Sequence, residues 1–347
     1  MDIAKIDKNF AVETQIQREG LRFYDAESAP FKIYGVYRDG DRFRRLPESV
    51  AKATSEGVLR LHANTAGGRV RFVTDSPFIA ISAEMGTVGK MPHFPFTGSI
   101  GFDVYSGKRY VYTFVPPIDV TERYEAIRDV LGGMREYTIN FPLYSEVKKL
   151  WIGLQEGCRL EAAPEYAIGD PVVYYGSSIT QGGCASRPGC AYQSIISRNL
   201  DCDHINLGFS GNAKGEEAIA EYIAGLKMSA FVYDYDHNAP TPEHLEATHE
   251  RMFKTIRKAQ PDLPILMLTR PKYYLADVEK QRLEIVRKTY ENALAAGDGN
   301  VYFIPGPELL LDLVREEALV DNCHPADGGF ISMAYVVGNK LKEILKK

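Results

Sequence analysis

The hydrophobic pattern of the chain changes near residue 164, and this change limits the possible folds more than any other feature. Before it, the segments 69–84, 99–116 and 135–157 alternate apolar and polar residues, and turn-forming residues separate the runs. This pattern predicts an antiparallel β-sandwich. From residue 170 onward, short apolar runs alternate with helical patterns. That alternation predicts a parallel sheet with helices on both faces. The overall prediction is an α/β protein with two domains, a sandwich over 1–165 and a parallel-sheet domain over 166–347.

The length and the net charge of the chain limit the classes of binding partner that can be expected. The chain has 347 residues, enough for two domains of ordinary size. Its net charge of −5 disfavours a nucleic-acid partner, which selects for basic faces. No apolar run approaches the roughly 20 residues that span a bilayer, so no membrane partner is expected. The N-terminal residues lack an apolar signal core, which favours a cytoplasmic address. Assembly into a homo-oligomer stays open.

The cysteines and histidines do not form a metal-binding pattern. The five cysteines are an odd number without scaffold spacing, as expected for reduced thiols. The sequence contains neither Cys-x-x-Cys nor His-x-x-x-His, so a structural zinc site is not expected. We expect neither a metal nor another cofactor.

The segment 174–183, YYGSSITQGG, contains the candidate nucleophile. It follows an apolar run at 171–175 that reads as a buried strand, and a helical pattern follows at 192–200. Open α/β sheets bind their ligands at the carboxyl ends of the strands, which is where Ser178 is expected. A lone serine after a strand is usually a helix cap, so the assignment depends on catalytic partners elsewhere in the chain.

Such partners occur further along the chain. The segment 321–324, DNCH, precedes the last helical pattern, and its Asp321 and His324 are three residues apart. A serine hydroxyl needs an imidazole to take its proton, and the imidazole needs an anchor, so His324 is the candidate base and Asp321 its orienter. The order Ser, Asp, His also occurs in α/β-hydrolases. Their nucleophile motif Gly-x-Ser-x-Gly, however, requires glycine where this chain has Thr180.

Together with NLGFSGN at 206–212 and DYDHN at 234–238, these blocks resemble the SGNH hydrolase superfamily, also called GDSL-type esterases. The resemblance implies a flavodoxin-like hydrolase domain. It also implies an oxyanion hole formed by the backbone N–H groups of Ser178 and Gly211 and the side-chain amide of Asn238. Two departures occur: Ser177 stands where the family has aspartate, and DHNA at 236–239 replaces Gly-x-Asn-Asp.

The segment 101–105, GFDVY, resembles the Gly-x-Asp-Leu-Tyr signature of a jelly-roll-like domain that precedes many SGNH domains. SGNH domains with a β-sandwich in front are often carbohydrate O-acetyl esterases. The resemblance therefore implies hydrolysis of short acyl esters, such as O-acetyl groups on a small-molecule or oligosaccharide substrate.

Two other functions remain open at this stage. One is an esterase or thioesterase with a non-carbohydrate acyl substrate, and the other is a carbohydrate-binding protein with a relic hydrolase domain. Further candidates for substrate contact are Arg187 after the nucleophile loop, His237 beside Asn238, and His93 in the aromatic loop 91–96.

Overall fold

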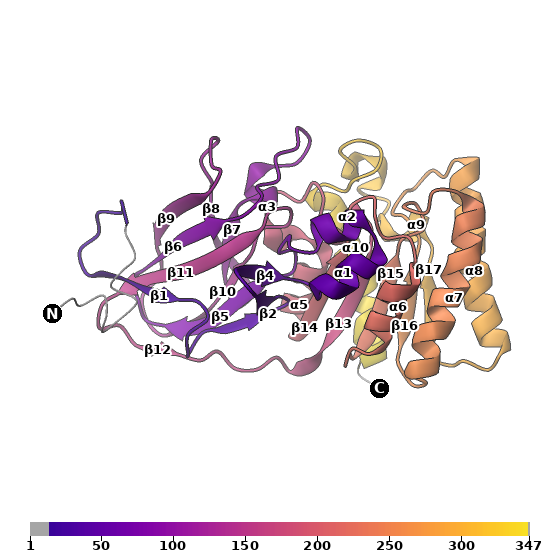
Figure 1. The fold of residues 1–347 in the computed structure, drawn as a ribbon, viewed down its shortest axis with the longest axis horizontal. Helices are drawn as coiled ribbons and strands as arrows, with labels where there is room; N and C mark the ends of the chain where they lie inside the picture. Colours follow the sequence, from indigo (N-terminus) through magenta and orange to yellow (C-terminus); the bar gives the residue numbers. More distant parts are fainter. Residues whose placement is uncertain (1–13, 346–347) are drawn as a thin grey trace.

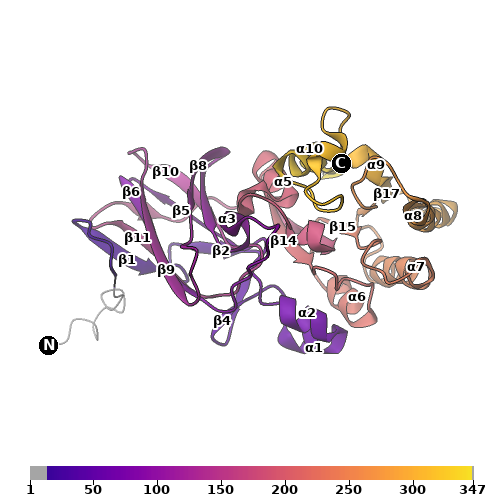
Figure 2. The ribbon, with the colours of Figure 1, turned by 90° about the horizontal axis from the view of Figure 1, so that it is seen from above.

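The structure is a computed structural model, and it describes residues 14–345. A β-sandwich and a parallel-sheet unit lie side by side along the long axis (Figures 1 and 2). The predicted fold class, a parallel-sheet α/β hydrolase domain preceded by an antiparallel sandwich, is confirmed. Among the described residues, no helix combines the length and apolar character that a bilayer crossing requires.

The sandwich consists of two antiparallel sheets. The first has the order β1-β11-β6-β9, with β1 at Leu21–Asp25, β11 at Val147–Gln155, β6 at Phe78–Met85 and β9 at Arg123–Asp129. The second has the order β12-β5-β10-β7-β8, with β12 at Leu160–Glu161, β5 at Arg69–Thr74, β10 at Arg135–Asn140, β7 at Phe102–Ser106 and β8 at Arg109–Phe114. The short strand β2 (Lys32–Tyr34) pairs with β5, and β3 (Tyr37–Asp39) pairs with β4 (Arg42–Arg44). Buried side chains of β5, β6, β7, β10 and β11 fill the space between the sheets, as the alternating pattern requires.

The second unit is a five-stranded parallel sheet. Its order is β14-β13-β15-β16-β17, with β13 at Ile168–Gly176, β14 at Cys202–Gly208, β15 at Ala230–Asp234, β16 at Ile265–Leu268 and β17 at Val301–Ile304. The strand order reverses direction at β13, because the chain passes first to β14 on one side and then to β15 on the other. A crevice at such a switch point is where doubly wound sheets place their ligands.

Helices cover both faces of the parallel sheet. On one face lie α6 (Glu217–Ala224), α7 (Pro242–Ala259) and α8 (Asp277–Ala295), which pack on alternate strand residues such as Val173 and Tyr175. On the other lie α5 (Tyr192–Leu200), α9 (Gly306–Leu309) and α10 (Asp327–Leu345), which pack on Val172 and Tyr174. Burial on both faces explains why β13 reads as one continuous apolar run.

Two helices from the N-terminal half of the chain pack on the parallel-sheet unit and not in the sandwich. The helices α1 (Glu48–Thr54) and α2 (Glu56–Leu61) join the core of the parallel-sheet unit, where α1 packs on α6, and both views show them there (Figures 1 and 2). Ser55 caps α2 by accepting a hydrogen bond from the Val58 N–H. The sequence pattern did not predict these helices or strand β9.

Candidate active site

Ser178 begins the short helix α4 (Ser178–Gln181), directly after β13. Ser177 is the helix cap, and its hydroxyl accepts a hydrogen bond from the Ile179 N–H at 3.1 Å. A serine in place of the family's aspartate therefore has a local role, because it stabilises the turn that carries Ser178. The helix ends at Gly182, whose φ of 103° favours glycine.

The turn can form because two glycines allow close packing behind it. A Cβ on Gly176 would lie 1.7 Å from Asp234 Oδ1, and a Cβ on Gly208 would lie 2.1 Å from the Gln181 N. The Thr180 hydroxyl donates a hydrogen bond to Asp234. Burial raises the pKa of Asp234 to about 8. Thr180, at the position that argued against an α/β-hydrolase elbow, thus anchors the turn to the neighbouring strand β15.

Ser178, His324 and Asp321 form a continuous hydrogen-bonded relay. Ser178 Oγ lies 2.8 Å from His324 Nε2, and His324 Nδ1 lies 2.8 Å from Asp321 Oδ2. The other carboxylate oxygen of Asp321 accepts the His324 backbone N–H at 2.8 Å. This arrangement fixes the imidazole with Nε2 toward the serine hydroxyl, as a serine–histidine–aspartate triad requires.

The environment of the relay favours a neutral imidazole and an ionised carboxylate. Burial lowers the pKa of His324, and this effect outweighs the hydrogen bond to Asp321, which raises it. Burial alone would raise the pKa of Asp321, but hydrogen bonds from the backbone and side chain of His324 hold it below its ordinary value. A neutral His324 beside an ionised Asp321 is the state that can accept a proton from Ser178.

Arg270, which follows β16, holds the loop that carries Asp321 and His324. Its guanidinium donates a hydrogen bond to the Asn322 carbonyl at 2.5 Å and pairs with Glu279 at 2.8 Å. Asn322 has a φ of 59°, an uncommon backbone conformation that lets the segment turn back on itself. The sequence analysis missed this positioning role, because no local pattern marks Arg270.

Gly211 and Asn238, the predicted oxyanion donors, belong to one network behind the nucleophile turn. Asn238 Nδ2 donates a hydrogen bond to the Phe209 carbonyl at 3.2 Å, which leaves its second N–H available. The Ser210 N–H donates to Gln181 Oε1 at 3.0 Å and so ties the loop before Gly211 to α4. The φ of 69° at Gly211 lies in the left-handed region that favours glycine. The first residue of a helix has no intrahelical partner for its N–H, so Ser178 N offers a third donor.

The sandwich contributes aromatic residues to the site. The His93 and Phe94 rings lie 5.6 Å and 5.7 Å from the His324 ring, centroid to centroid. Tyr144 donates its hydroxyl to the Ser178 carbonyl at 3.0 Å. His237 is also near, since its charge is among the influences that lower the pKa of His324. His93 therefore flanks the triad base, whereas His237 contacts Asp236, which lies 3.6 Å from its Nδ1.

Arg187 lies in a different environment. Its guanidinium sits 4.2 Å over the Tyr110 ring and lies 3.7 Å from Asp103 and 3.9 Å from Asp327. These contacts join the sandwich to the catalytic half and match an ion-paired arginine rather than a substrate contact.

Asp103, from the GFDVY segment, is fully buried and accepts hydrogen bonds at 2.8 Å from both the Gly189 N–H and Asn140 Nδ2. The signature aspartate thus docks one half of the molecule on the other.

Two groups of side chains in the described part of the chain have metal-ligand spacing, and both include His324. They are His93, Cys184 and His324, and Asp321, Cys323 and His324. Burial raises the pKa of the Cys184 thiol to about 12. A metal bound by either group would take the base away from Ser178.

A doubly wound sheet with this relay at its switch point defines an ester hydrolase of the SGNH type. The chain belongs to the GDSL-like lipase/acylhydrolase family, whose model matches residues 169–342. A second model, for the N-terminal part of SGNH-type esterases with the GxDLY signature, matches residues 21–160. The predictions of the family and of a carboxylic ester hydrolase are confirmed.

Solved structures share the whole architecture. A GDSL-like lipase from Bacteroides ovatus superposes with a TM-score of 0.84 at 27% identity, over 94% of this chain and 98% of that one. The salicylyl-acyltransferase SsfX3 of a tetracycline biosynthetic pathway superposes with a TM-score of 0.76 at 19% sequence identity, over 94% of this chain and 98% of that one. A family two carbohydrate esterase from Clostridium thermocellum, in complex with cellohexaose, superposes with a TM-score of 0.62 at 14% sequence identity, over 91% of this chain and 99% of that one. A comparison with curated protein sequences finds no match.

Proposed function

We propose that the protein is a serine esterase that removes short acyl groups, acetyl foremost, from carbohydrate hydroxyls. The observation that carries the proposal is the relay from Ser178 Oγ through His324 to Asp321, with 2.8 Å at each link. A carbohydrate substrate is supported by the shared fold of the family two carbohydrate esterase and of an acetyl xylan esterase from Butyrivibrio proteoclasticus.

The first half of the reaction forms an acyl-enzyme. Ser178 Oγ attacks the ester carbonyl carbon while His324 Nε2 takes the hydroxyl proton. The carbonyl oxygen becomes an oxyanion, which the N–H groups of Ser178, Gly211 and Asn238 stabilise. When the intermediate collapses, the C–O bond to the sugar breaks and His324 returns the proton to the leaving hydroxyl.

The second half releases the acid. His324 takes a proton from water, the resulting nucleophile attacks the acyl-enzyme, and the bond to Ser178 Oγ breaks as the proton returns to it. Asp321 stays ionised throughout and stabilises the imidazolium that forms in each half. This mechanism uses no metal or cofactor.

The test of the nucleophile compares two neighbouring serines. Ser178→Ala is expected to lower hydrolysis of p-nitrophenyl acetate by more than about 10⁴-fold, because the acyl acceptor is lost. Ser177→Ala removes only a helix cap and is expected to keep activity within about tenfold. Thermal unfolding of both variants checks folding. An organophosphonate probe on the unmodified protein, mapped by peptide mass spectrometry, should label Ser178. Full activity in Ser178→Ala, or labelling elsewhere, would remove the assignment.

The test of the substrate is acetate release from acetylated xylo-, manno- and cello-oligosaccharides, with the position of deacetylation followed by NMR. Active enzyme that releases acetate from p-nitrophenyl acetate but from none of these sugars would exclude the carbohydrate part of the proposal. Saccharide binding without any ester hydrolysis would instead indicate a binding protein.

A second candidate is acyl chemistry on a non-carbohydrate substrate, and one comparison favours it. The salicylyl-acyltransferase has a higher TM-score with this chain than the carbohydrate esterase has, 0.76 against 0.62. Esters of acetate, butyrate, octanoate and salicylate, assayed with and without an added alcohol acceptor, separate the two. Preference for aromatic or long acyl groups, or transfer to the alcohol in place of hydrolysis, would support the second candidate.

A further inference from the structure

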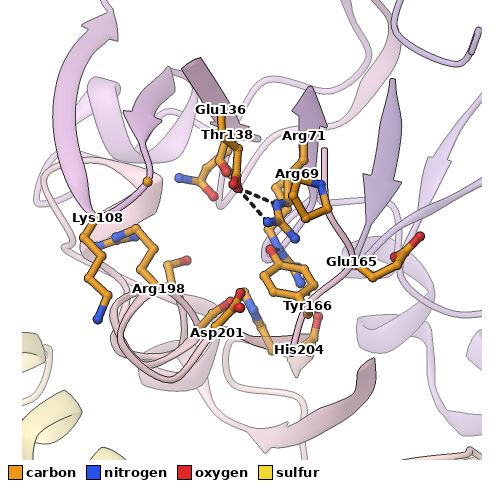
Figure 3. A pocket seen from close by; sticks show the side chains of 15 residues that line it. Arg69, Arg71, Lys108, Glu136, Thr138, Glu165, Tyr166, Arg198, Asp201 and His204 are labelled. Carbon is orange, nitrogen blue, oxygen red and sulfur yellow. Dashed lines mark hydrogen bonds and ion pairs between the residues drawn. The ribbon is translucent and has the colours of Figure 1, made fainter. Parts of the chain in front are cut away.

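A second polar cavity, separate from the triad, lies where the sandwich meets the edge strand β14 (Figure 3). It has a volume of about 360 Å³. Arg71 and Glu136 come from the sandwich, Arg198 from α5, and His204 from β14, while Tyr166 lies on the segment between the two halves. His204 pairs in register with Val172, and Gly208 with Gly176. The cavity is therefore four residues back along β14 from the end where the nucleophile turn begins.

One arginine of the cavity is fully used by the fold. Arg69 is 2% exposed. Its guanidinium bonds the Tyr166 hydroxyl and the Gly67 carbonyl, both at 2.8 Å, and pairs with Asp203. Each of the three guanidinium nitrogens of Arg69 thus has a partner, and Arg69 holds the linking segment against β14.

Two other arginines each keep a free donor. Arg71 is 4% exposed and pairs with Glu136 at 2.6 Å through Nη2, but within residues 14–345 its Nη1 has no hydrogen-bond partner. Arg198 donates through Nη2 to the Gly189 carbonyl at 2.7 Å, and its Nη1 also has none. Both Nη1 atoms are buried. Each guanidinium group also lies over an aromatic ring, Arg71 at 4.0 Å from the Tyr166 centroid and Arg198 at 3.8 Å from the Tyr105 centroid. A charged donor that is buried without an acceptor is costly, and a bound water or ion is one way in which such a donor is satisfied.

His204 supplies a third donor to the same cavity. The residue is 1% exposed, and neither ring nitrogen has a partner among the described residues. Burial, together with the charges of Arg69 and Arg198, holds its pKa well below the ordinary value. The ring is therefore neutral and offers one N–H donor and one acceptor.

The charged groups around these donors include Asp103, whose pKa is raised by burial and lowered in smaller part by the charge of Arg198. Arg69 is matched by Asp203 and Arg71 by Glu136, whereas Arg198 and Lys108 bond only main-chain carbonyls. Glu165 is turned toward Lys32 and Tyr34. Asp201 is the remaining acidic group of the lining, and it accepts the Ala167 N–H at 3.3 Å.

We propose that this cavity binds a small oxyanion, a carboxylate or phosphate group, between the two halves of the protein. The anion accepts hydrogen bonds from Arg71 Nη1, Arg198 Nη1 and a ring N–H of His204. Guanidinium groups suit both oxyanions, because their planar donors match the oxygen spacing. A sugar acid and a phosphate compound share this chemistry.

The experiment measures binding to the full chain by isothermal titration at constant ionic strength. Three probes are used: inorganic phosphate, glucuronate, and glucose as the uncharged control. Saturable binding of phosphate alone or of glucuronate alone supports the proposal and identifies the source of the anion. Saturable binding of both, in competition, supports the general oxyanion site. Binding of none at 50 mM, or equal binding of glucose and glucuronate, overturns it.

Variants then locate the site. Arg71→Gln and Arg198→Gln each remove one free donor, from different halves, and should weaken binding at least about tenfold. Arg287→Gln on α8 makes the same charge change at an exposed ion pair and should leave binding unchanged. Thermal unfolding shows which variants fold. Unweakened binding in a folded Arg71 or Arg198 variant would place the anion elsewhere and overturn the proposal.

Discussion

The sandwich meets the catalytic half in two places that differ in how their polar groups are satisfied. At the triad, each atom of the relay has a partner within the chain, and Tyr144 from the sandwich bonds the Ser178 carbonyl. At the cavity beside β14, the buried Nη1 donors of Arg71 and Arg198 and the ring nitrogens of His204 have no hydrogen-bond partner in the described part of the chain. The first site is preorganised, so binding or reaction requires little rearrangement of its own groups. At the second site, the cavity beside β14, the buried donors are satisfied only when a ligand binds.

The largest expected effect comes from breaking the preorganised site alone. Asp321→Asn keeps the size of the side chain but removes the anion that fixes the His324 tautomer, so kcat should fall by about 10⁴-fold. Steady-state kinetics with p-nitrophenyl acetate measure this loss. Anion binding at the cavity should be unchanged in the same variant, because Asp321 contributes nothing there. A loss of both properties would contradict the view that the two sites are separate.

The next effect concerns the oxyanion donors. Asn238→Ala removes the side-chain amide and should lower kcat by about 100- to 1000-fold with little change in KM, because the donor acts mainly on the transition state. Asn238→Asp is the matched variant of equal size. It should be at least as damaging, since a carboxylate would repel the oxyanion. Activity near that of the unmodified protein in both would exclude Asn238 from the hole.

Asp103 lies in the contact between the two halves, so its loss should weaken the whole interface. Asp103→Ala leaves the Gly189 N–H and the Asn140 amide without their acceptor and should lower the free energy of unfolding by about 2–4 kcal/mol. Urea unfolding measures this change.

The effect of Asp103 should also depend on pH. Burial raises the pKa of Asp103 to about 6, above its ordinary 3.8. Its contribution to stability is therefore complete below about pH 3.8 and is lost as the pH rises through about 6. The difference between the unmodified protein and Asp103→Ala should be larger at pH 5 than at pH 8. An equal difference at both pH values would mean that the carboxyl titrates normally.

The smallest effect tests the sandwich loop at the triad. Catalysis needs neutral His324, so kcat/KM should fall as the pH drops through a pKa below 6.5. The charge of His93 helps to lower that pKa, and His93→Ala should move the acid limb upward by a few tenths of a pH unit. His244→Ala, with a histidine that bonds the Lys214 carbonyl, is the control and should leave the limb in place. An equal shift of the acid limb in the His244→Ala control would contradict a specific effect of His93 on the pKa of His324.

Much of the candidate active site could be located from the sequence, because its residues lie at strand and helix ends that a pattern can predict. Ser178 follows an apolar run, and Asp321 and His324 precede the last helix. The role of Ser177 was not predictable, since cap geometry depends on the turn that actually forms. Arg187 was placed near the substrate for its position after the nucleophile loop, but its ion pairs with Asp103 and Asp327 occupy it at the interface.

The sequence by itself determined the fold class and the family. The change of hydrophobic period near residue 164 and the order of the short motifs are both local properties of the chain. Tertiary structure alone decided which sandwich residues reach the triad and which donors remain unpaired beside β14. Arg71 and His204 are more than a hundred residues apart and share no motif. They meet in one cavity only because a sheet of the sandwich packs against β14, the edge strand of the parallel sheet. Burial and hydrogen-bond satisfaction depend on all neighbours in space, so a local pattern in the sequence does not reveal them.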